Sequence, residues 1–468
     1  MRYFIVLFLF FLGINLSFAE VRLPAVIGSH MVLQQNAEVK LWGWCNPGEK
    51  VTVTTSWDGA KYETAGESSA KWLVKVKTPK AGGPFNITIK GSNEIILEDV
   101  LIGEVWICGG QSNMEWSGTQ KLKQSLEEAP KATNKNIRLF YVAKSTSEHK
   151  QEDVQGTWKV NSPEDMRRFS AIGYFFGKKL NEELNVPVGL INSNWGGTPA
   201  EAWTPKDSIE KSAELKAAAA ALTPRKGWPI TPGLAYNAMI YPLSNYNIAG
   251  AIWYQGESNT ETWNSYKPLF SSMIGSWRQS WEKDFPFYYV QIAPFDYKKG
   301  IIGPLLREAQ TKTLEVPNTG MVVISDLVND VKNIHPENKV DVGLRLAGLA
   351  LTKTYNKEGQ KYLYPLYKSY KVEKNKIRVL FDNLKGGLEF RGKPSEFYIA
   401  GEDKVFVPAK AKISGNSVIV WSDSVSKPLA VRFGFTNTAI PNLFSKEGLP
   451  VNIFRTDNWD VNTIPQAN

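Results

Sequence analysis

The sequence of 468 residues predicts an α/β domain between two β-rich segments, and three observations support this fold class. Short runs of alternating apolar and polar residues, separated by turn residues, fill residues 20–98, as in β-sandwich domains. Residues 99–360 alternate between strand-like apolar runs and helical patterns, which is typical of a parallel sheet covered by helices. Strand-like runs return in a C-terminal β-rich domain at residues 361–468. The length itself predicts two or three domains.

Hydrophobic periodicity locates individual elements within these domains. Apolar residues recur at every second position in residues 39–44, 51–55 and 72–76, which predicts three strands. Residues 167–184 have the spacing of an amphipathic helix, and the alanine-rich residues 208–222 predict an exposed one. The two β-rich segments are expected either to pack on each other or to lie apart, with the C-terminal segment capping the α/β domain.

Residues 1–19 have the features of a signal peptide. Arg2 supplies a positive charge, residues 3–12 form an apolar run, and residues 17–19 are of the kind that a signal peptidase reads. The apolar run is shorter than the roughly 20 residues that span a bilayer. No cysteine lies at the cleavage point, so a lipoprotein anchor is not indicated. The mature protein is therefore expected in the periplasm or outside the cell, without a membrane anchor.

Charge and cysteine usage limit the classes of partner. The formal net charge is +9, without a dense block of lysine and arginine, so nucleic-acid binding is not expected. Cys45 and Cys108 are the two cysteines; they allow one disulfide and lack metal-ligand spacing. Cys108 lies within a predicted strand and is interpreted as a small buried apolar residue. Neither a metal nor a cofactor is expected.

Ser112 is the candidate nucleophile. Residues 104–108 predict a buried strand, and Gly109 and Gly110 then allow a sharp turn immediately before this serine. A serine just past a strand end exposes its hydroxyl and its backbone N–H together. It can attack a carbonyl carbon and also donate to the oxyanion that forms. The alternative interpretation is a serine that only caps or turns the chain.

Two further stretches have the same layout. Residues 189–198 and 253–259 each begin as an apolar strand and end in glycine and amide residues. Because the carboxyl ends of parallel strands meet at one edge of the sheet, these stretches are expected to lie beside Ser112.

A serine nucleophile needs a general base, and the chain has three histidines. His30 lies in the N-terminal β segment and His149 in a charged run, so both are interpreted as structural or solvated. His335 follows a strand expected at residues 321–325 and precedes a helix expected to begin near Pro336. That position at a strand end is the one a catalytic base requires.

The four blocks together resemble a known superfamily. GQSNM at residues 110–114, GGT at 196–198, QGESN at 255–259 and IHP at 334–336 follow one another in this order. The set resembles the SGNH hydrolases, and within them the branch of sialate O-acetylesterases and acetylxylan-esterase-like proteins. The resemblance extends from about residue 23 to residue 459.

This resemblance implies a flavodoxin-like, three-layer parallel-sheet hydrolase domain that acts on O-acetylated carbohydrate. It also implies an oxyanion hole made by the N–H groups of Ser112 and of Gly196 or Gly197. A side-chain amide is expected to complete it, with Gln255 and Asn259 as unranked candidates.

Five further residues are expected at the substrate: Gln111, Glu201, Trp203, Glu257 and Arg307. Trp203 would offer an aromatic wall for a sugar ring, although a core tryptophan is the plain alternative. Glu257 is expected either to orient its block or to form an ordinary salt bridge. Arg307 would suit the carboxylate of a sialic acid, because arginine binds carboxylates in a bidentate manner.

The sequence departs from the superfamily at the acid of the triad. Members usually carry an acidic residue two or three positions before the histidine, where this chain has Asn333 and Lys332. Asp330 and Asp326 lie farther away in the same loop. His335 is therefore expected to be oriented by a backbone carbonyl, by Asn333 or by Asp330.

Two classes of function follow. One is an exported carbohydrate O-acetylesterase acting on sialic acid, with acetylated xylan or another plant polysaccharide as the alternative substrate. The other is a non-catalytic glycan-binding protein on a hydrolase scaffold, which the missing acid suggests. Retention of Ser112, of both glycine blocks and of His335 favours the enzyme.

The signal peptide predicts that the mature chain begins at Glu20. Intact-mass and N-terminal peptide mass spectrometry of the exported protein should find this terminus. An exported chain that still begins at Met1 would contradict the prediction.

Overall fold

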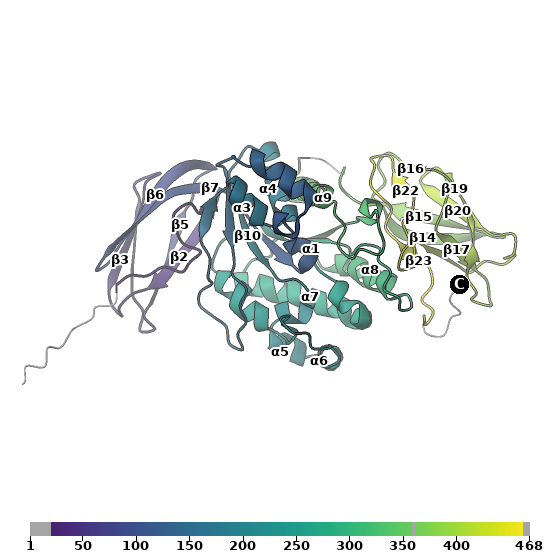
Figure 1. Ribbon diagram of the computed structural model, residues 1–468, viewed down its shortest axis with the longest axis horizontal. Coiled ribbons are helices and arrows are strands. Elements are labelled where there is room, and N and C mark those ends of the chain that lie inside the picture. Colours follow the sequence, from purple (N-terminus) through teal and green to yellow (C-terminus); the bar gives the residue numbers. More distant parts are fainter. Residues whose placement is uncertain (1–19, 358–360, 462–468) are drawn as a thin grey trace, which may run out of the picture.

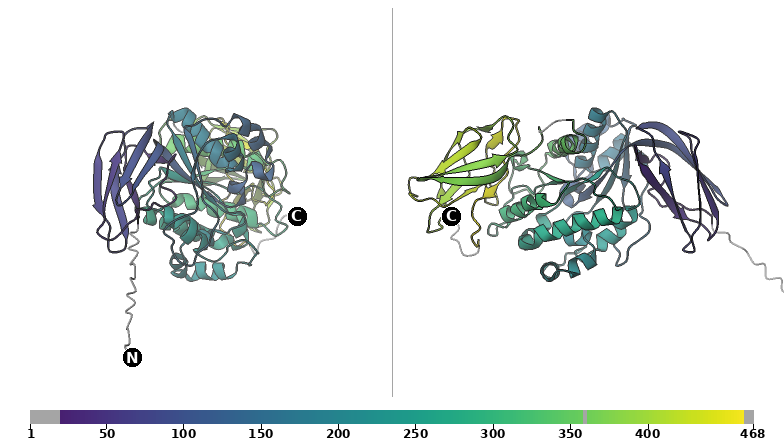
Figure 2. Two further views of the ribbon diagram at one scale, coloured as in Figure 1. Left: turned by 60° about the vertical axis from the view of Figure 1, so that its left-hand side comes forward. Right: turned by 180° about the vertical axis from the view of Figure 1, so that it is seen from behind.

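The computed structural model describes residues 20–357 and 361–461, which form three parts arranged along one axis (Figure 1). The predicted signal peptide lies outside the described residues. The two β-rich parts lie at opposite ends of the α/β part in Figure 1 and in the right view of Figure 2. They therefore do not pack on each other. None of the described helices is long and apolar enough to cross a membrane.

The N-terminal part is built from two sheets. One sheet pairs β2 (Glu38–Trp44) with β5 (Lys71–Lys77). The other contains β1 (Val32–Gln34), β3 (Lys50–Thr55), β4 (Lys61–Ala65), β6 (Gly82–Lys90) and the beginning of β7 (Glu94–Gly110). Every second residue of β5 is buried, because only one face of this strand meets the core.

Strand β7 connects the N-terminal part to the α/β part without a break. Its first half pairs antiparallel with β6, and its second half pairs parallel with β10 (Val188–Asn194) and β11 (Gly250–Tyr254). From Val100 to Gly110 every residue is buried, as expected for a strand at the centre of a covered sheet. The predicted boundary between residues 98 and 99 thus falls inside one strand.

The α/β part contains a mostly parallel sheet in the order β13-β12-β11-β7-β10-β8-β9. The strands not yet described are β8 (Ile137–Tyr141), β9 (Trp158–Val160), β12 (Phe287–Val290) and β13 (Thr319–Val322). Only β9, at the edge, pairs antiparallel within this ordered path. The chain passes from one side of β7 to the other between β10 and β11. The carboxyl end of β7 is therefore a switch point, where α/β sheets place their sites.

Helices cover both faces of this sheet (Figure 1). On one face Trp106 packs against Phe176 of α4 (Ala171–Leu184), which lies beside α9 (Lys339–Lys353). On the other face Trp253 packs against Phe270 of α7 (Trp263–Trp281). Glycines stand opposite both tryptophans, Gly250 beside Trp106 and Gly109 beside Trp253, and leave room for the indole rings.

The remaining helices are short, and several begin where a side chain caps them. The helix expected at residues 167–184 is two helices, α3 (Pro163–Arg168) and α4, because Ser170 accepts from the Gly173 N–H and starts a new helix. The one expected at 208–222 is divided into α5 (Lys206–Glu210) and α6 (Ala213–Ala220), with Ser212 as the cap of α6. The others are α1 (Ser112–Glu115), α2 (Lys123–Glu128) and α8 (Ile302–Lys312).

The C-terminal part has a hydrophobic core of its own. One sheet contains β14 (Leu366–Glu373), β15 (Lys376–Asp382), β20 (Ser417–Trp421) and β19 (Lys410–Ser414). A second contains β18 (Val407–Pro408), β17 (Phe397–Ala400), β21 (Ala430–Phe433) and β23 (Phe454–Arg455). The pair β16 (Leu388–Phe390) and β22 (Leu443–Ser445) completes it.

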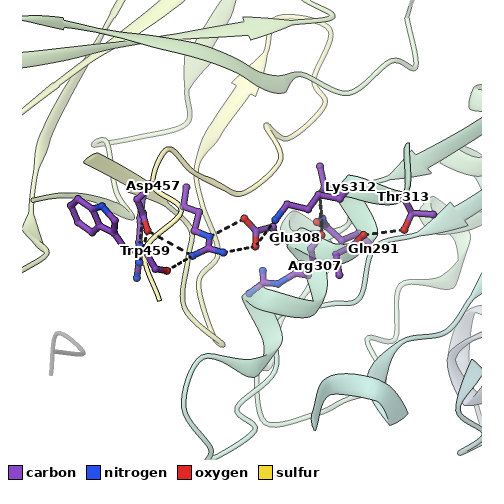
Figure 3. Close-up of polar contacts among 11 residues, drawn as sticks. Gln291, Arg307, Glu308, Lys312, Thr313, Asp457 and Trp459 are labelled. Carbon is purple, nitrogen blue, oxygen red and sulfur yellow. Dashed lines mark hydrogen bonds and ion pairs between the residues drawn. The ribbon is translucent and has the colours of Figure 1, made fainter. Parts of the chain in front are cut away.

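Helix α8 holds this C-terminal part to the α/β part. Arg455 binds Glu308 of α8 through two hydrogen bonds of 2.9 and 3.0 Å. Figure 3 shows Glu308 on the side of α8 that faces Asp457 and Trp459 of the C-terminal part. The Oδ1 atom of Asn437 accepts from the N–H of Gly303, also in α8, at 2.9 Å. The C-terminal segment therefore caps the α/β part, which is one of the two arrangements expected from the sequence.

Candidate active site

Ser112 stands directly after the central strand because the chain turns at Gly110. The φ angle of Gly110 is +140°, and a Cβ there would lie 2.2 Å from the carbonyl oxygen of Tyr254 on β11. Only glycine fits both the conformation and the contact. The next N–H, of Gln111, donates to that same carbonyl at 2.9 Å. Helix α1 then begins at Ser112.

His335 meets this serine from the loop between β13 and α9. Its Nε2 atom lies 2.8 Å from the Ser112 Oγ, within the reach that a nucleophile and its base require. The other two histidines lie elsewhere: His30 binds Asp99 at 2.7 Å in the N-terminal part, and His149 is exposed. Sequence and structure thus select the same serine and histidine.

Among the described residues, no carboxylate forms a hydrogen bond with the His335 ring. Asp326 binds Arg345 through both oxygens, at 2.7 and 2.5 Å. Asp330 is exposed, and its carboxylate accepts from the N–H of Lys332, which also faces solvent. Within residues 20–357 and 361–461, His335 Nδ1 forms no hydrogen bond with a protein group.

Asn333 and Trp116 hold His335 in other ways. The Oδ1 atom of Asn333 accepts from the backbone N–H of His335 at 2.9 Å, so this side chain fixes the loop instead of the ring. The indole of Trp116 stacks on the imidazole with ring centroids 4.4 Å apart and an interplanar angle of 20°. Stacking of this kind restricts rotation of the ring but does not select its tautomer.

A buried polar network lies beneath the Ser–His pair. The amide nitrogen of Asn113 donates to the carbonyl of Ile334 at 3.0 Å and to Glu257 at 2.5 Å. The amide oxygen of Asn113 accepts from the ammonium of Lys339, also at 2.5 Å. The residue after the nucleophile is thereby linked to the peptide immediately before His335.

The charges of this network act on His335. Burial raises the pKa of Glu257 and lowers that of Lys339. Burial, and next the positive charge of Lys339, lower the pKa of His335 to about 4. The imidazole is consequently neutral at neutral pH and able to accept the proton of Ser112.

No pattern in the sequence assigns a role to Asn113 or to Lys339. A signal for Lys339 exists in the spacing of α9. Lys339, Val342, Leu346 and Leu349 follow one another at helical intervals of three and four, and all four are buried. A lysine on the apolar stripe of a helix has no solvent to face, so a buried partner has to be sought.

The backbone N–H groups of Ser112, Gly196 and Gly197 differ in whether they already donate a hydrogen bond. The N–H of Gly196 donates at 2.5 Å to Glu115, whose other oxygen binds Lys144 at 2.6 Å. The N–H groups of Ser112 and Gly197 donate to none of the described residues. These two amides are the donors left for an oxyanion.

The side-chain amides of Gln255 and Asn259 donate hydrogen bonds to other protein groups. Gln255 donates to the carbonyl of Thr198 and to the side-chain oxygen of Asn259, at 3.3 and 2.8 Å. Asn259 donates to Glu201 at 2.8 Å and to Thr262 at 3.3 Å. Each NH₂ group therefore has both hydrogens engaged, and this arrangement lends no support to the expectation that one of them completes an oxyanion hole.

The residues expected to wall a sugar pocket are instead parts of the scaffold. Trp203 is fully buried, and its indole N–H donates to Thr198 at 2.8 Å, so the alternative of a core tryptophan holds. Glu201 is buried against Asn259. Gln111 is also buried, and its side-chain oxygen accepts at 3.3 Å from the N–H groups of Gly256 and Ser258.

Arg307 does not face a substrate site either. It is 1% exposed in α8, and its guanidinium donates to the carbonyl of Thr436 in the C-terminal part at 2.5 Å. Figure 3 shows it beside the contact between Glu308 and the C-terminal part. Burial lowers the pKa of Arg307 to about 10. The expectation that it binds a sialate carboxylate was wrong, because the C-terminal part covers it.

Cysteine and metal sites complete the description. Cys45 and Cys108 are both free and buried, so the one possible disulfide does not form, and Cys108 is the small apolar residue that its position predicted. Among the described residues, no group of three or more His, Cys, Asp and Glu side chains is arranged to hold a metal ion.

A serine–histidine pair at the carboxyl edge of a parallel sheet is the arrangement of the α/β class of hydrolases. Comparison with known proteins narrows this class. Residues 102–352 match the family described as carbohydrate esterase, sialic acid-specific acetylesterase, and the chain belongs to that family.

Individual relatives agree with this assignment. Sialate O-acetylesterase of Homo sapiens is 32% identical over 383 residues, which cover 74% of this chain and 73% of the human one. The enzyme of the same name from Mus musculus is 30% identical over 414 residues, 75% of this chain and 76% of that one. A carbohydrate acetylesterase from Xanthomonas citri is similar in structure, with a TM-score of 0.86 and 37% identity over 94% of this chain and all of that chain.

The position of Lys339 predicts a change in pH dependence. In Lys339→Met the positive charge near His335 is removed, so the pKa of His335 should rise from about 4 toward its ordinary value of 6.5. Because the base must be neutral to act, the acidic limb of kcat/KM should move to higher pH. The measurement is kcat/KM against pH with p-nitrophenyl acetate.

Lys332→Met is the matched control for this experiment, because Lys332 is an exposed lysine three positions before His335. Its acidic limb should coincide with that of the unmodified protein. An acidic limb that stays in place in a folded Lys339→Met protein would contradict the assigned effect of Lys339.

Proposed function

We propose that this protein is an exported serine esterase of the SGNH type, with a flavodoxin-like three-layer domain, that removes O-acetyl groups from sialic acid. The observation that carries the proposal is the 2.8 Å contact between Ser112 Oγ and His335 Nε2 at the end of β7. The family to which the chain belongs supports the choice of an acetylated sialic acid.

The reaction is an acyl transfer in two halves. His335 Nε2 accepts the proton of Ser112 as the serine oxygen attacks the acetyl carbonyl carbon. The N–H groups of Ser112 and Gly197 donate to the resulting oxyanion. The bond from the acetyl carbon to the sugar oxygen then breaks, and His335 returns the proton to the sugar hydroxyl. Water, deprotonated by the same imidazole, releases acetate and restores Ser112.

His335 works here without a triad acid. In a full triad the carboxylate selects the imidazole tautomer and stabilises the imidazolium. In this chain Trp116 fixes the plane of the ring, and Asn333 and Asn113 fix the loop that carries it. Nδ1 bonds to none of the described residues, and Lys339 disfavours the imidazolium. We therefore assign a catalytic dyad with a weak base.

Two alternatives can be compared with this proposal. An acetylesterase for xylan or another plant polysaccharide draws support from the broader description of the Xanthomonas citri relative as a carbohydrate acetylesterase. A non-catalytic glycan-binding protein would not need a hydrogen bond between Ser112 and His335, so their contact disfavours that class. Export remains part of the proposal and depends on residues 1–19.

Replacement of the nucleophile tests the enzyme class. Ser112→Ala should lower acetate release from an O-acetyl sialic acid by at least about 10⁴-fold with the fold intact, because no other group takes over the attack. The comparison substrate is acetylated xylan, assayed with the unmodified protein. Acetate release near the unmodified level in Ser112→Ala would remove Ser112 from the mechanism, and a preference for xylan would replace the proposed substrate.

The dyad makes a second prediction. Asp330→Asn should cost no more than about tenfold in kcat, or about 1.4 kcal/mol, because Asp330 is exposed and does not contact the ring. His335→Ala should approach the loss of Ser112→Ala. The measurement is kcat for both variants with circular dichroism as the check of folding. If Asp330→Asn matched His335→Ala, Asp330 would be the acid of a full triad.

A further inference from the structure

An exposed turn lies over the glycine block of the site. Residues 223–231 belong to the segment that connects α6 to the π-helical turn η4 (Tyr236–Ile240). Within them the N–H of Trp228 donates to the carbonyl of Arg225 at 3.2 Å, and Gly227 has a φ of +82°. The turn brings the two side chains together, with the guanidinium carbon of Arg225 5.4 Å from the centre of the Trp228 ring.

Trp228 rests directly on Gly197. A Cβ placed on Gly197 would lie 2.2 Å from Cδ2 of the Trp228 indole, so only a glycine admits the ring at this distance. A Cβ on the neighbouring Gly196 would lie 3.4 Å from the Cβ of Ser112. The indole therefore lies on the glycine block that adjoins Ser112, and 39% of the Trp228 surface is open to solvent.

Other cations of the site are not available to a ligand. Lys144 is held by Glu115 at 2.6 Å, and Lys339 is buried on Asn113. Arg307 is covered by the C-terminal part. Arg225, in contrast, is exposed, and its guanidinium forms no hydrogen bond or ion pair with any of the described residues. Its guanidinium lies over the Trp228 ring, which in turn lies on Gly197 of the glycine block.

We propose that Arg225 and Trp228 form the subsite that binds the carboxylate-bearing sugar ring of the substrate. The guanidinium binds the carboxylate through two charge-assisted hydrogen bonds. The indole packs against the apolar face of the sugar and positions its acetyl group over Ser112. Because the stacked arginine is already restricted before the ligand arrives, less conformational entropy is lost on binding.

This inference rests on the proposed function and concerns the specificity of the esterase for an acidic sugar. A neutral acetylated sugar would leave Arg225 without a partner and would use Trp228 alone. A sialic acid, which carries a carboxylate at the ring carbon that bears the glycosidic bond, would use both residues. The pair therefore distinguishes an acidic from a neutral acetyl sugar, which the Ser–His pair alone does not.

The test compares two substrates that differ in this charge and in one methyl group. Acetate release is measured from 9-O-acetyl-N-acetylneuraminic acid and from its methyl ester, and the ratio of the two kcat/KM values is taken. The unmodified protein should favour the acid. Arg225→Gln should lower the ratio about tenfold, through KM for the acid, because a charged hydrogen bond of about 1.5 kcal/mol or more is lost. Arg225→Lys should retain part of the preference.

Matched variants complete the design. Lys226→Gln removes the neighbouring exposed charge and should leave the ratio unchanged. Trp228→Ala should raise KM for both substrates, and more for the acid, because Arg225 then loses the ring that restricts it. An Arg225→Gln protein with an unchanged ratio, or an unmodified protein with a ratio near one, would overturn this inference while leaving the esterase in place. Failure of the unmodified protein to release acetate from either substrate would instead overturn the proposed function and this inference with it.

Discussion

The close approach of Gly110 to the carbonyl of Tyr254 is the constraint on which the site depends. Strand β7 leaves the N-terminal sheet, becomes the central strand of the parallel sheet and must turn within one residue of its end. A side chain at position 110 would collide with β11, so the turn is possible only with glycine. That turn places Ser112 within 2.8 Å of His335, which arrives from the far edge of the sheet.

Much of this could be predicted, because the signals are local. Strand-like runs that end in glycine and amide residues mark the carboxyl ends of β7, β10 and β11, and parallel strands bring such ends together. Three histidines left a small choice of base. Helix boundaries were less certain: Asn338 caps α9, so this helix begins at Lys339 and not near Pro336, because the Asn338 side chain satisfies the free N–H of Asp341.

The roles of individual polar residues could not be predicted in the same way. Gln255 and Asn259 are equivalent amide donors as far as the sequence shows. Only the fold shows that the NH₂ groups of both donate to buried neighbours. Arg307 resembled a ligand for a carboxylate, but the C-terminal part, more than a hundred residues away in the chain, covers it. No sequence pattern indicates a role for Trp228, because its contact with Gly197 is between two loops without hydrophobic periodicity.

We infer that Ser112 is an activated nucleophile although none of the described carboxylates contacts the His335 ring. An alkyl fluorophosphonate tests this directly, because it phosphonylates a serine hydroxyl with loss of fluoride only where a neighbouring base activates that hydroxyl. The reagent is applied to the intact, folded protein, and the modified peptide is located by mass spectrometry. We expect one adduct for each chain, on the peptide that contains Ser112. An unlabelled protein, or an adduct on a different serine, would contradict it.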